Sequence, residues 1–187
     1  MILFFDTETT GLPGKNANWE TDFKNFPGIA QIAWVVADSP CNILYKYESV
    51  ILTDKPMSPE AAAVHGITPE MILKDGMSER RVLEHFLLDA KRCETIVGHN
   101  IYFDTSIIKA SMLRLEFDKD EFIKALDKTK RVDTMRMVKG GKWPKLSELY
   151  KKLFNEELVG AHGAMADVMA VKKCYFELVK SQQKEVI

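Results

Sequence analysis

The fold of this chain is decided by its first residues, Met1-Ile2-Leu3-Phe4-Phe5-Asp6-Thr7-Glu8-Thr9-Thr10-Gly11. They begin with an unbroken apolar run, which predicts a central strand buried on both faces. Because side chains alternate along a strand, Asp6 and Glu8 point to the same face, about 6–7 Å apart along the chain. Two carboxylates held together in a core are costly unless a cation lies between them. The stretch therefore predicts a metal site, followed by a turn at Thr9-Thr10-Gly11.

The composition of the chain is that of one globular domain, residues 1–187. Hydrophobic residues make up 46% and charged residues 28%, and no linker, repeat or low-complexity segment divides the chain. The apolar stretches are too short for a membrane span, and the N-terminal run lacks the basic lead of a secretory signal. Cys41, Cys93 and Cys174 fit no metal or disulfide spacing, which favours free thiols in a reducing cytoplasm. The net charge of −1 argues against a protein that coats a polyanion, but it does not exclude binding to nucleic acid.

Hydrophobic patterning predicts an α/β fold with a mixed five-stranded sheet flanked by helices. Two strands, 29–37 and 43–53, follow the first strand and are joined by a short turn, which predicts an antiparallel start. The later strands, 95–98 and 131–134, alternate with helices, which favours parallel pairing. Helices are predicted at 58–64, from 68, from 78, and at 102–115, 119–130, 145–154 and 164–180.

A long polar loop, residues 12–27, separates the first two strands and carries Trp19, Phe23 and Phe26. Aromatic side chains in such a segment either pin the loop to the protein body or offer stacking surfaces, and pinning is the commoner use. The loop follows the acidic strand directly, so it is expected to border any site built there.

A second loop is basic. Between Lys128 and Lys145 lie seven basic residues and a single acid, Asp133, together with Gly140-Gly141 and Trp143. A basic loop with an aromatic residue suits a phosphate backbone, but solvated lysines also explain such a composition. The sequence leaves both interpretations open.

Two further aspartates begin helices on the face that points inward. The positions three, four, seven and eleven residues after Asp104 are mostly apolar, and those after Asp167 are all apolar. A single Asp at a helix start is often only a cap. Four acids that reach the core from different elements are harder to explain structurally, and an all-oxygen site favours Mg²⁺ or Mn²⁺. Two such ions about 3.5–4 Å apart serve phosphodiester hydrolysis, which becomes the leading chemistry.

Three motifs resemble the DEDDh group of 3′→5′ exonucleases, which have an RNase H-like fold and include the proofreading epsilon subunit of bacterial DNA polymerase III. The motifs are Phe5-Asp6-Thr7-Glu8-Thr9-Thr10-Gly11-Leu12, Gly98-His99-Asn100-Ile101-Tyr102-Phe103-Asp104 and His162-Gly163-Ala164-Met165-Ala166-Asp167. Lesser signatures at 65–68, 132–134 and 145–149 fall where that group has them. The resemblance covers nearly the whole chain, and the loop at residues 12–27 is longer than in many members of the group.

The resemblance implies a role for each matching residue. Asp6, Glu8, Asp104 and Asp167 are expected to bind two divalent ions, Mg²⁺ or Mn²⁺, and His162 to act as the general base that takes a proton from the attacking water. The backbone around the first turn is expected to hold the terminal nucleotide, with Leu12 wedged against its base. The substrate-binding residues implied are Thr9, Thr10, Gly11, Leu12, His65, Gly66, Ile67, Asn100 and Phe103.

The resulting expectation is a cytoplasmic, metal-dependent 3′→5′ exonuclease that releases nucleoside 5′-monophosphates, with single-stranded DNA ends favoured and association with a DNA polymerase open. One alternative is a nuclease of RNA or oligoribonucleotide 3′ ends. Another, from a different class, is a polymerase-associated nucleic-acid-binding module with a vestigial site. The intact set of four acids and His162 speaks against the vestigial site.

Overall fold

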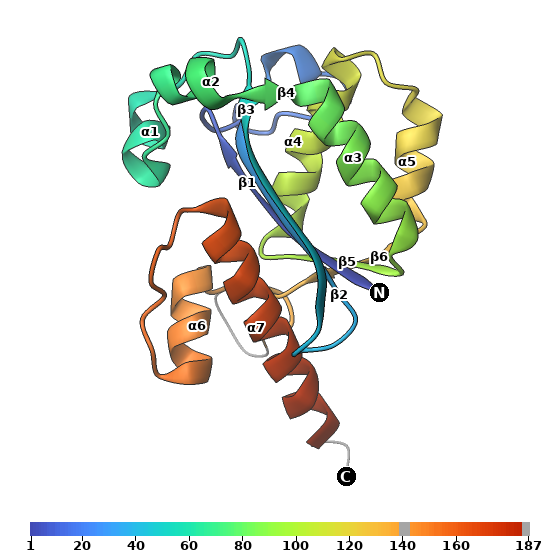
Figure 1. The fold of residues 1–187 in the computed structure, drawn as a ribbon, viewed down its shortest axis with the longest axis vertical. Helices are drawn as coiled ribbons and strands as arrows, with labels where there is room; N and C mark the ends of the chain where they lie inside the picture. The colour runs from blue at the N-terminus through green and yellow to red at the C-terminus, as the bar shows by residue number, and fades with distance from the viewer. Residues whose placement is uncertain (139–142, 185–187) are drawn as a thin grey trace.

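A computed structural model describes residues 1–138 and 143–184 of the chain (Figure 1). Its centre is a mixed sheet in the order β4-β3-β2-β1-β5-β6. Antiparallel pairing joins β1 to β2 and β2 to β3, and parallel pairing joins β1 to β5 and β5 to β6. The strands are β1 Ile2–Thr9, β2 Ile29–Ala37, β3 Ile43–Leu52, β4 Met77–Ser78, β5 Thr95–Gly98 and β6 Lys130–Asp133. The antiparallel start and the parallel later strands are as the sequence predicted.

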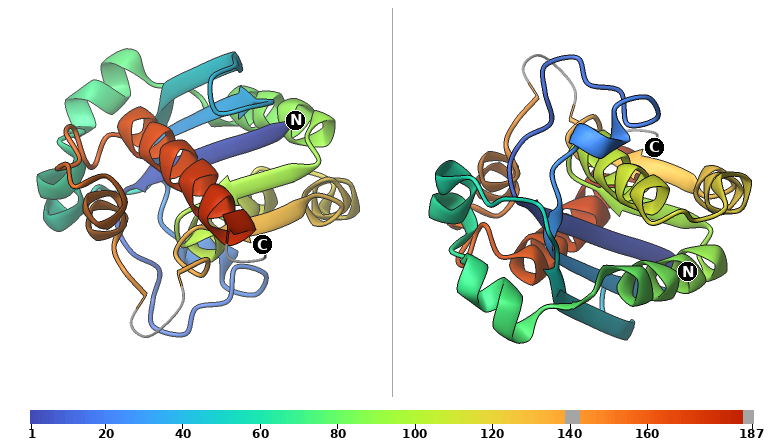
Figure 2. Two further views of the ribbon diagram at one scale, coloured as in Figure 1. Left: turned by 90° about the horizontal axis from the view of Figure 1, so that it is seen from below. Right: turned by 90° about the horizontal axis from the view of Figure 1, so that it is seen from above.

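Helices cover both faces of the sheet. In Figure 1, α3, α4 and α5 lie on one face, and α7 lies on the other with α6 beside it. Figure 2 shows α7 crossing the strands obliquely. The helices are α1 Pro59–His65, α2 Pro69–Asp75, α3 Glu79–Arg92, α4 Ile101–Arg114, α5 Lys119–Asp127, α6 Leu146–Phe154 and α7 Ala164–Lys184, with a short 3₁₀ helix at Phe23–Asn25. None of these helices, within the described ranges, is long and apolar enough to cross a bilayer.

The sheet has six strands where the sequence predicted five. The additional strand, β4, pairs in parallel with Ile51 and Leu52 at the outer edge of β3. Two residues are too few to show an alternating pattern. Ser78, which the sequence placed at the start of the following helix, is also the N-cap residue of α3. The helix start was therefore visible in the sequence and the strand before it was not.

Strand β1 lies inside the sheet with both faces covered, as its apolar run predicted. Phe5 faces α3, where its ring centroid lies 5.3 Å from that of Phe86. Phe4 faces the opposite way and joins the core beneath α7. Both phenylalanines are almost fully buried, and each such burial contributes about 1.5–3 kcal/mol. The same alternation carries Asp6 and Glu8 to the α7 face.

The parallel partner of β1 ends before β1 does. Pairing with β5 stops at Phe4 opposite Val97, and the chain then turns through Gly98 and Asn100 into α4. Beyond that point β1 pairs with β2 alone and continues to Thr9. The C-terminal half of β1 therefore has one edge open to the start of α4.

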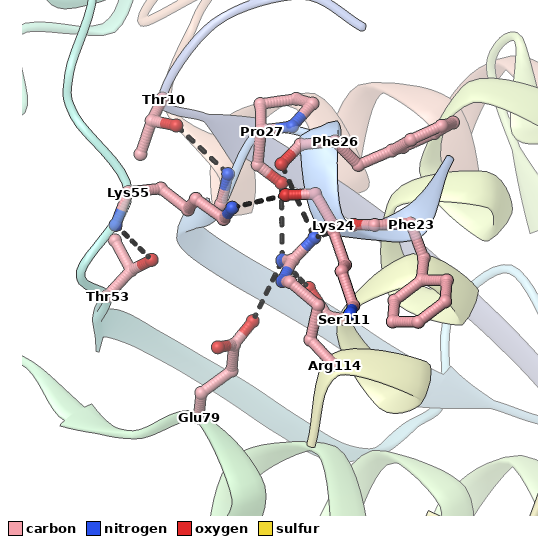
Figure 3. Close-up of polar contacts among 11 residues, drawn as sticks. Thr10, Phe23, Lys24, Phe26, Pro27, Thr53, Lys55, Glu79, Ser111 and Arg114 are labelled. Atoms are coloured by element: carbon pink, nitrogen blue, oxygen red, sulfur yellow. Dashed lines mark hydrogen bonds and ion pairs between the residues drawn. The ribbon is translucent and has the colours of Figure 1, made fainter. Parts of the chain in front are cut away.

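The long loop between β1 and β2 is fixed to the body of the protein. Phe26 is buried, and Trp19 and Phe23 pack against the main core, so its aromatic residues pin the loop as predicted. Arg114, the last residue of α4, donates hydrogen bonds to the carbonyl oxygens of Phe23, Phe26 and Pro27 at 3.0, 3.4 and 3.3 Å (Figure 3). The end of the loop is thus held by a planar guanidinium group, whose several donors suit several carbonyls at once.

The fixed end of the loop continues into the turn after β1. Gly28 exchanges two hydrogen bonds with Thr10: its carbonyl accepts from the Thr10 N–H at 2.9 Å, and its N–H donates to the Thr10 hydroxyl at 3.0 Å. The N–H of Ser58 donates to the Thr10 carbonyl at 2.8 Å. A Cβ on Gly28 would lie 2.4 Å from the hydroxyl of Thr53, so no larger residue fits there. The turn at Thr10 is therefore held from both sides.

We predict that Arg114→Leu lowers the free energy of unfolding by about 3 kcal/mol, because the carbonyls lose their donors and the half-buried carboxylate of Glu79, 3.9 Å away, loses its cation. Urea denaturation measures the change. Arg131→Leu is the control, since Arg131 is 43% exposed and its ion pair with Asp127 at 3.4 Å is exposed as well. Equal, small effects of the two substitutions would show that Arg114 does not anchor the loop.

Candidate active site

Carboxylates from β1 and α7 meet at one end of the sheet. One carboxyl oxygen from each of Asp6, Glu8 and Asp167 lies within 4.8 Å of the other two. All three side chains are half-buried. The two-residue repeat of β1 places two of them on one face, and the first turn of α7 brings the third onto that face.

Gln31 of β2 helps to fix the N-terminus of α7 over the strands. Its side-chain Oε1 accepts a hydrogen bond from the N–H of Ala164 at 3.3 Å, and Gln31 lies opposite Glu8 in the register of β1 and β2. Asp167 is thereby brought beside Glu8. Its Oδ2 accepts a hydrogen bond from the N–H of His162 at 3.2 Å. Its Oδ1 is buried and has no hydrogen-bond partner in the part of the chain that the structure describes.

Asp104 approaches the same place from α4. It is buried, and its Oδ1 accepts hydrogen bonds from the N–H and the hydroxyl of Thr7 at 3.0 and 2.7 Å. The carboxylate uses the edge of β1 that β5 leaves open. Asp104 does not belong to the group of three oxygens within 4.8 Å that the described residues form, but its charge raises the pKa of both Asp6 and Glu8. The fourth predicted acid thus adjoins the other three.

The acids are strongly perturbed by burial and by one another. Burial, followed by the charges of Asp104, Asp167 and Glu8, raises the pKa of Asp6 well above its usual range. Burial and the neighbouring aspartates raise the pKa of Glu8 to about 7. Burial raises the pKa of Asp104 to about 7 although the hydrogen bonds from Thr7 oppose the shift. In the absence of a cation, the cluster therefore holds protons at neutral pH.

The donor set fits a hard divalent cation. Every group in the cluster is a carboxylate oxygen, the ligand type of Mg²⁺ and Mn²⁺. The buried Oδ1 of Asp167 has no protein donor among the described residues, and such an atom is costly unless a cation or water satisfies it. A divalent ion would also offset the repulsion that contributes to the raised pKa values of Asp6 and Glu8.

His162 lies in the loop before α7 with an exposed side chain. Its backbone has φ of 69°, in the left-handed region that side chains with a Cβ rarely adopt, and the nearby Gly160 has φ of 74°. Burial lowers the pKa of His65, a hydrogen bond to Thr9 opposes this, and the charge of His162 lowers it further. His162 therefore lies near both Asp167 and His65.

A cavity of about 450 Å³ opens beside the acids. Its lining comes from the end of β1, the turn after it, α1 and the start of α4, and includes Glu8 of the acidic cluster. Leu12 is the most exposed large apolar side chain there, at 83%. The lining residues are Thr7, Glu8, Thr9, Gly11, Leu12, Ser58, Glu60, Ala61, Val64, His65 and Phe103.

Of the nine predicted substrate residues, five line this cavity: Thr9, Gly11, Leu12, His65 and Phe103. The others lie elsewhere. Thr10 is buried and bonded to Gly28, Ile67 packs in a small core cluster with Ala30 and Ile72, and Gly66 ends α1 at φ of 72°. Asn100 is exposed, and its N–H donates to Asp133 Oδ1 at 2.9 Å. These four residues are thus placed to support the cavity from behind or beside it.

His65 links the cavity to the turn after β1. Its Nδ1 accepts a hydrogen bond from the N–H of Ile67 at 3.0 Å. The proton of the neutral ring is therefore on Nε2, which lies 3.2 Å from the carbonyl oxygen of Thr9 and donates to it. The imidazole fixes the backbone that continues into Gly11 and Leu12.

Several supporting residues were missed from the sequence. Thr7 orients Asp104, Gln31 fixes α7, and Arg114 anchors the loop. Gln31 gives a signal, because it is the one polar residue inside the apolar run of β2. Thr7 and Arg114 give none, since their partners are about 90 residues away in the chain.

Cavity size alone would have pointed to another place. A hollow of about 810 Å³ lies between α6 and α7, lined by residues such as Phe154, Met169 and Lys173. None of the four acids lines it. The chemistry therefore identifies the smaller cavity as the site.

We predict that the metal-free protein loses stability as pH rises from about 4 to about 7. The folded cluster holds protons that the unfolded chain releases near pH 4, so the folded state binds more protons in this window. Thermal unfolding in EDTA measures the decline. Mn²⁺ should raise the melting temperature more at pH 8 than at pH 5, because at pH 8 it does not compete with protons. A larger Mn²⁺ effect at pH 5 would contradict the assignment.

Comparison with known proteins agrees with this arrangement. The chain matches the Exonuclease family of RNase T type over residues 3–175. It is 27% identical over 184 residues to DNA polymerase III subunit epsilon of Haemophilus influenzae, covering 96% of this chain and 68% of that protein.

Two kinds of solved structure share the fold. E. coli exonuclease I in complex with a dT13 oligonucleotide aligns with a TM-score of 0.76 and 24% identity, covering 99% of this chain and 42% of that chain. Exonuclease X in complex with 5′-overhanging duplex DNA aligns with a TM-score of 0.66 and 24% identity, covering 98% of this chain and 93% of that chain. This chain thus spans less than half the length of the exonuclease I chain. With its RNase H-like sheet and acidic cluster, the protein belongs to the exonuclease family of DEDD type.

Proposed function

We propose that this protein is a metal-dependent 3′→5′ exonuclease that removes nucleotides from single-stranded DNA ends and releases nucleoside 5′-monophosphates. The observation that carries the proposal is the group of three carboxylates within 4.8 Å, with the unpartnered Asp167 Oδ1, beside a cavity of nucleoside size. Membership of the exonuclease family supports the reaction class, and the direction follows the DEDD type.

The terminal nucleoside would occupy the 450 Å³ cavity. Leu12, Val64 and Phe103 offer apolar and aromatic surface to its base and sugar. The backbone from Thr9 to Leu12 forms the floor and is held in place through His65 and Gly28. Glu8 lines the same cavity, so the phosphate of a nucleotide seated there would lie next to the acidic cluster.

Asp6, Glu8, Asp104 and Asp167 would hold two divalent ions, Mg²⁺ or Mn²⁺. Bound there, the ions supply charge stabilisation for both the attacking and the leaving oxygen of an in-line displacement. The protein orients these ligands in advance. Thr7 fixes the Asp104 carboxylate, and the His162 N–H fixes one oxygen of Asp167. The other oxygen of Asp167 stays available.

His162 would accept the proton of the attacking water. The ring is exposed, and the N–H of His162 is bonded to Asp167, so the imidazole lies within reach of a water molecule at the acidic cluster. The water oxygen forms the new bond to phosphorus as the bond from phosphorus to the 3′ oxygen breaks. The 3′ oxygen leaves on the shortened strand and gains a proton, and the released nucleotide carries the phosphate on its 5′ oxygen.

The preference for DNA is supported by the neighbouring structures. Exonuclease I binds a dT13 oligonucleotide and exonuclease X binds a 5′-overhanging duplex DNA in the aligned structures. The similarity to a polymerase III subunit supports a DNA polymerase as a partner. RNA ends remain the alternative within the same reaction class, because DNA and RNA have the same phosphodiester bond on which the acids would act.

We expect purified protein with Mn²⁺ or Mg²⁺ to shorten 5′-labelled single-stranded DNA one nucleotide at a time. Matched DNA and RNA oligonucleotides, single- and double-stranded, measure the preference, and Asp6→Ala is the inactive control because it removes a central carboxylate. Faster degradation of RNA would replace DNA with RNA as the substrate. No shortening of either strand type would leave a nucleic-acid-binding module with a vestigial site.

We expect His162→Ala to lower kcat by at least about 100-fold while leaving substrate affinity within a few-fold, as for the loss of a general base. Single-turnover rates and oligonucleotide binding in Ca²⁺ measure the two quantities. His85→Ala is the matched control, because His85 packs against Trp34 near Met1, away from the acids. A variant that turns over normally once bound would assign His162 to substrate positioning instead.

A further inference from the structure

A second hollow, of about 560 Å³, lies beside the first turn of α4. It is formed where β6 ends and α4 begins, and its lining includes Ile101, Tyr102, Thr105, Arg131, Asp133 and Arg136. We call it the β6–α4 groove. Tyr102 and Phe103 are consecutive residues of α4, and Tyr102 lines the β6–α4 groove while Phe103 lines the nucleoside cavity. The two hollows therefore share the first turn of the helix that carries Asp104.

The β6–α4 groove is positively charged in effect. Its acid, Asp133, is bonded within the protein, because its Oδ1 accepts hydrogen bonds from the N–H groups of Asn100 and Met135 at 2.9 and 3.0 Å. Arg136 and Arg131 have exposed side chains, at 61% and 43%. Arg136 lies 3.6 Å from the Asp133 carboxylate, which is 7% exposed, and Arg131 forms a weak, exposed ion pair with Asp127 at 3.4 Å. Both guanidinium groups keep exposed surface that can contact another anion.

Two exposed aromatic side chains accompany the arginines. Tyr102 is 64% exposed and Trp143 is 58% exposed. The guanidinium carbon of Arg136 lies 5.1 Å from the centroid of a Trp143 ring. The chain next to Trp143 is fixed close to the site, because the ring of His99 donates a hydrogen bond from Nε2 to the carbonyl of Pro144 at 2.9 Å. Exposed aromatic faces beside arginines are the surface that a single strand needs for stacking and phosphate contact.

The groove also lies at the end of the sheet over which the nucleic acid must pass. The parallel strands β1, β5 and β6 end on the same side of the sheet, and Asp6 and Glu8 lie in the C-terminal half of β1 there. A nucleic-acid strand whose last nucleotide fills the cavity beside Glu8 must leave the site over a neighbouring surface of the protein. The β6–α4 groove offers positive charge and stacking faces on the helix that bounds the cavity.

We propose that the β6–α4 groove, with Trp143 at its rim, binds the single strand upstream of the 3′ terminus. Arg131 and Arg136 contact its phosphates, and Tyr102 and Trp143 stack on its bases. This inference rests on the proposed function, since it assigns the path of the same substrate. It takes Arg131, Arg136 and Trp143 of the basic loop as nucleic-acid-binding residues; Gly140-Gly141 of that loop lies outside the described residues.

The test compares two substrates. The p-nitrophenyl ester of thymidine 5′-monophosphate carries only the terminal nucleotide, and a single-stranded oligonucleotide of about ten residues reaches the groove. We expect Trp143→Ala to lower the ratio of kcat/KM for the oligonucleotide to kcat/KM for the ester about tenfold. We expect Arg136→Gln to lower this ratio as well. It should also reduce the slope of log KM against log salt concentration for the oligonucleotide by about 0.7, the value expected for the loss of one phosphate contact on a single strand.

Arg92→Gln is the matched control, because Arg92 is 69% exposed and also pairs with an aspartate three residues away at 3.6 Å, but lies on α3. An unchanged ratio and salt slope in both groove variants, with an active wild type, would overturn the inference and leave the proposed function intact. Equal loss on ester and oligonucleotide would also overturn it, by assigning these residues to the fold or the reacting centre. A wild type inactive on both substrates would overturn the proposed function and the inference together.

Discussion

The central constraint on this structure is that carboxylates must be held close together at the end of β1, which is energetically unfavourable. Asp6, Glu8 and Asp167 bring oxygens within 4.8 Å; burial raises the pKa of all three, and the charges of neighbouring carboxylates add to the shift at Asp6 and Glu8. The protein sustains this arrangement by embedding β1 between two helical layers, so that the strand cannot move to separate the charges. It also directs N–H donors of Thr7 and His162 at the acids that come from the helices. The remaining charge is left for a cation.

Most of the fold could be predicted because its signals are local. The apolar run of β1 marked the centre of the sheet, and apolar spacing marked the helices that begin with Asp104 and Asp167. The two-residue strand β4 could not be predicted, because its existence depends on Ile51 and Leu52 of another strand. Register, in the same way, is a property of pairs of strands: nothing near Gln31 in the sequence says that it lies opposite Glu8.

The residues of the site show the same difference between local signals, which the sequence reveals, and contacts between distant segments, which it does not. Its four acids were visible because buried charge contradicts an apolar pattern, and the group of three in the structure shows that β1 and α7 do bring acids together. The substrate residues were predicted as continuous motifs, whereas a cavity is lined by whichever side chains point inward. Thr10 and Ile67 belong to those motifs but face the core, whereas Ser58, the N-cap of α1, and Ala61 line the cavity without belonging to any.

Helix α4 joins the two halves of the site into one rigid unit. Its first turn carries Asp104, and its last residue, Arg114, holds the loop end that sets Gly28 against Thr10. Both contacts lie on one helix of 14 residues, without flexible chain between them. Helix α4 therefore fixes both the Asp104 carboxylate and the floor of the cavity, although the two come from different segments of the chain. The long loop after β1 is for this reason part of the framework of the site, and a change in its anchored end would move the floor relative to Asp104.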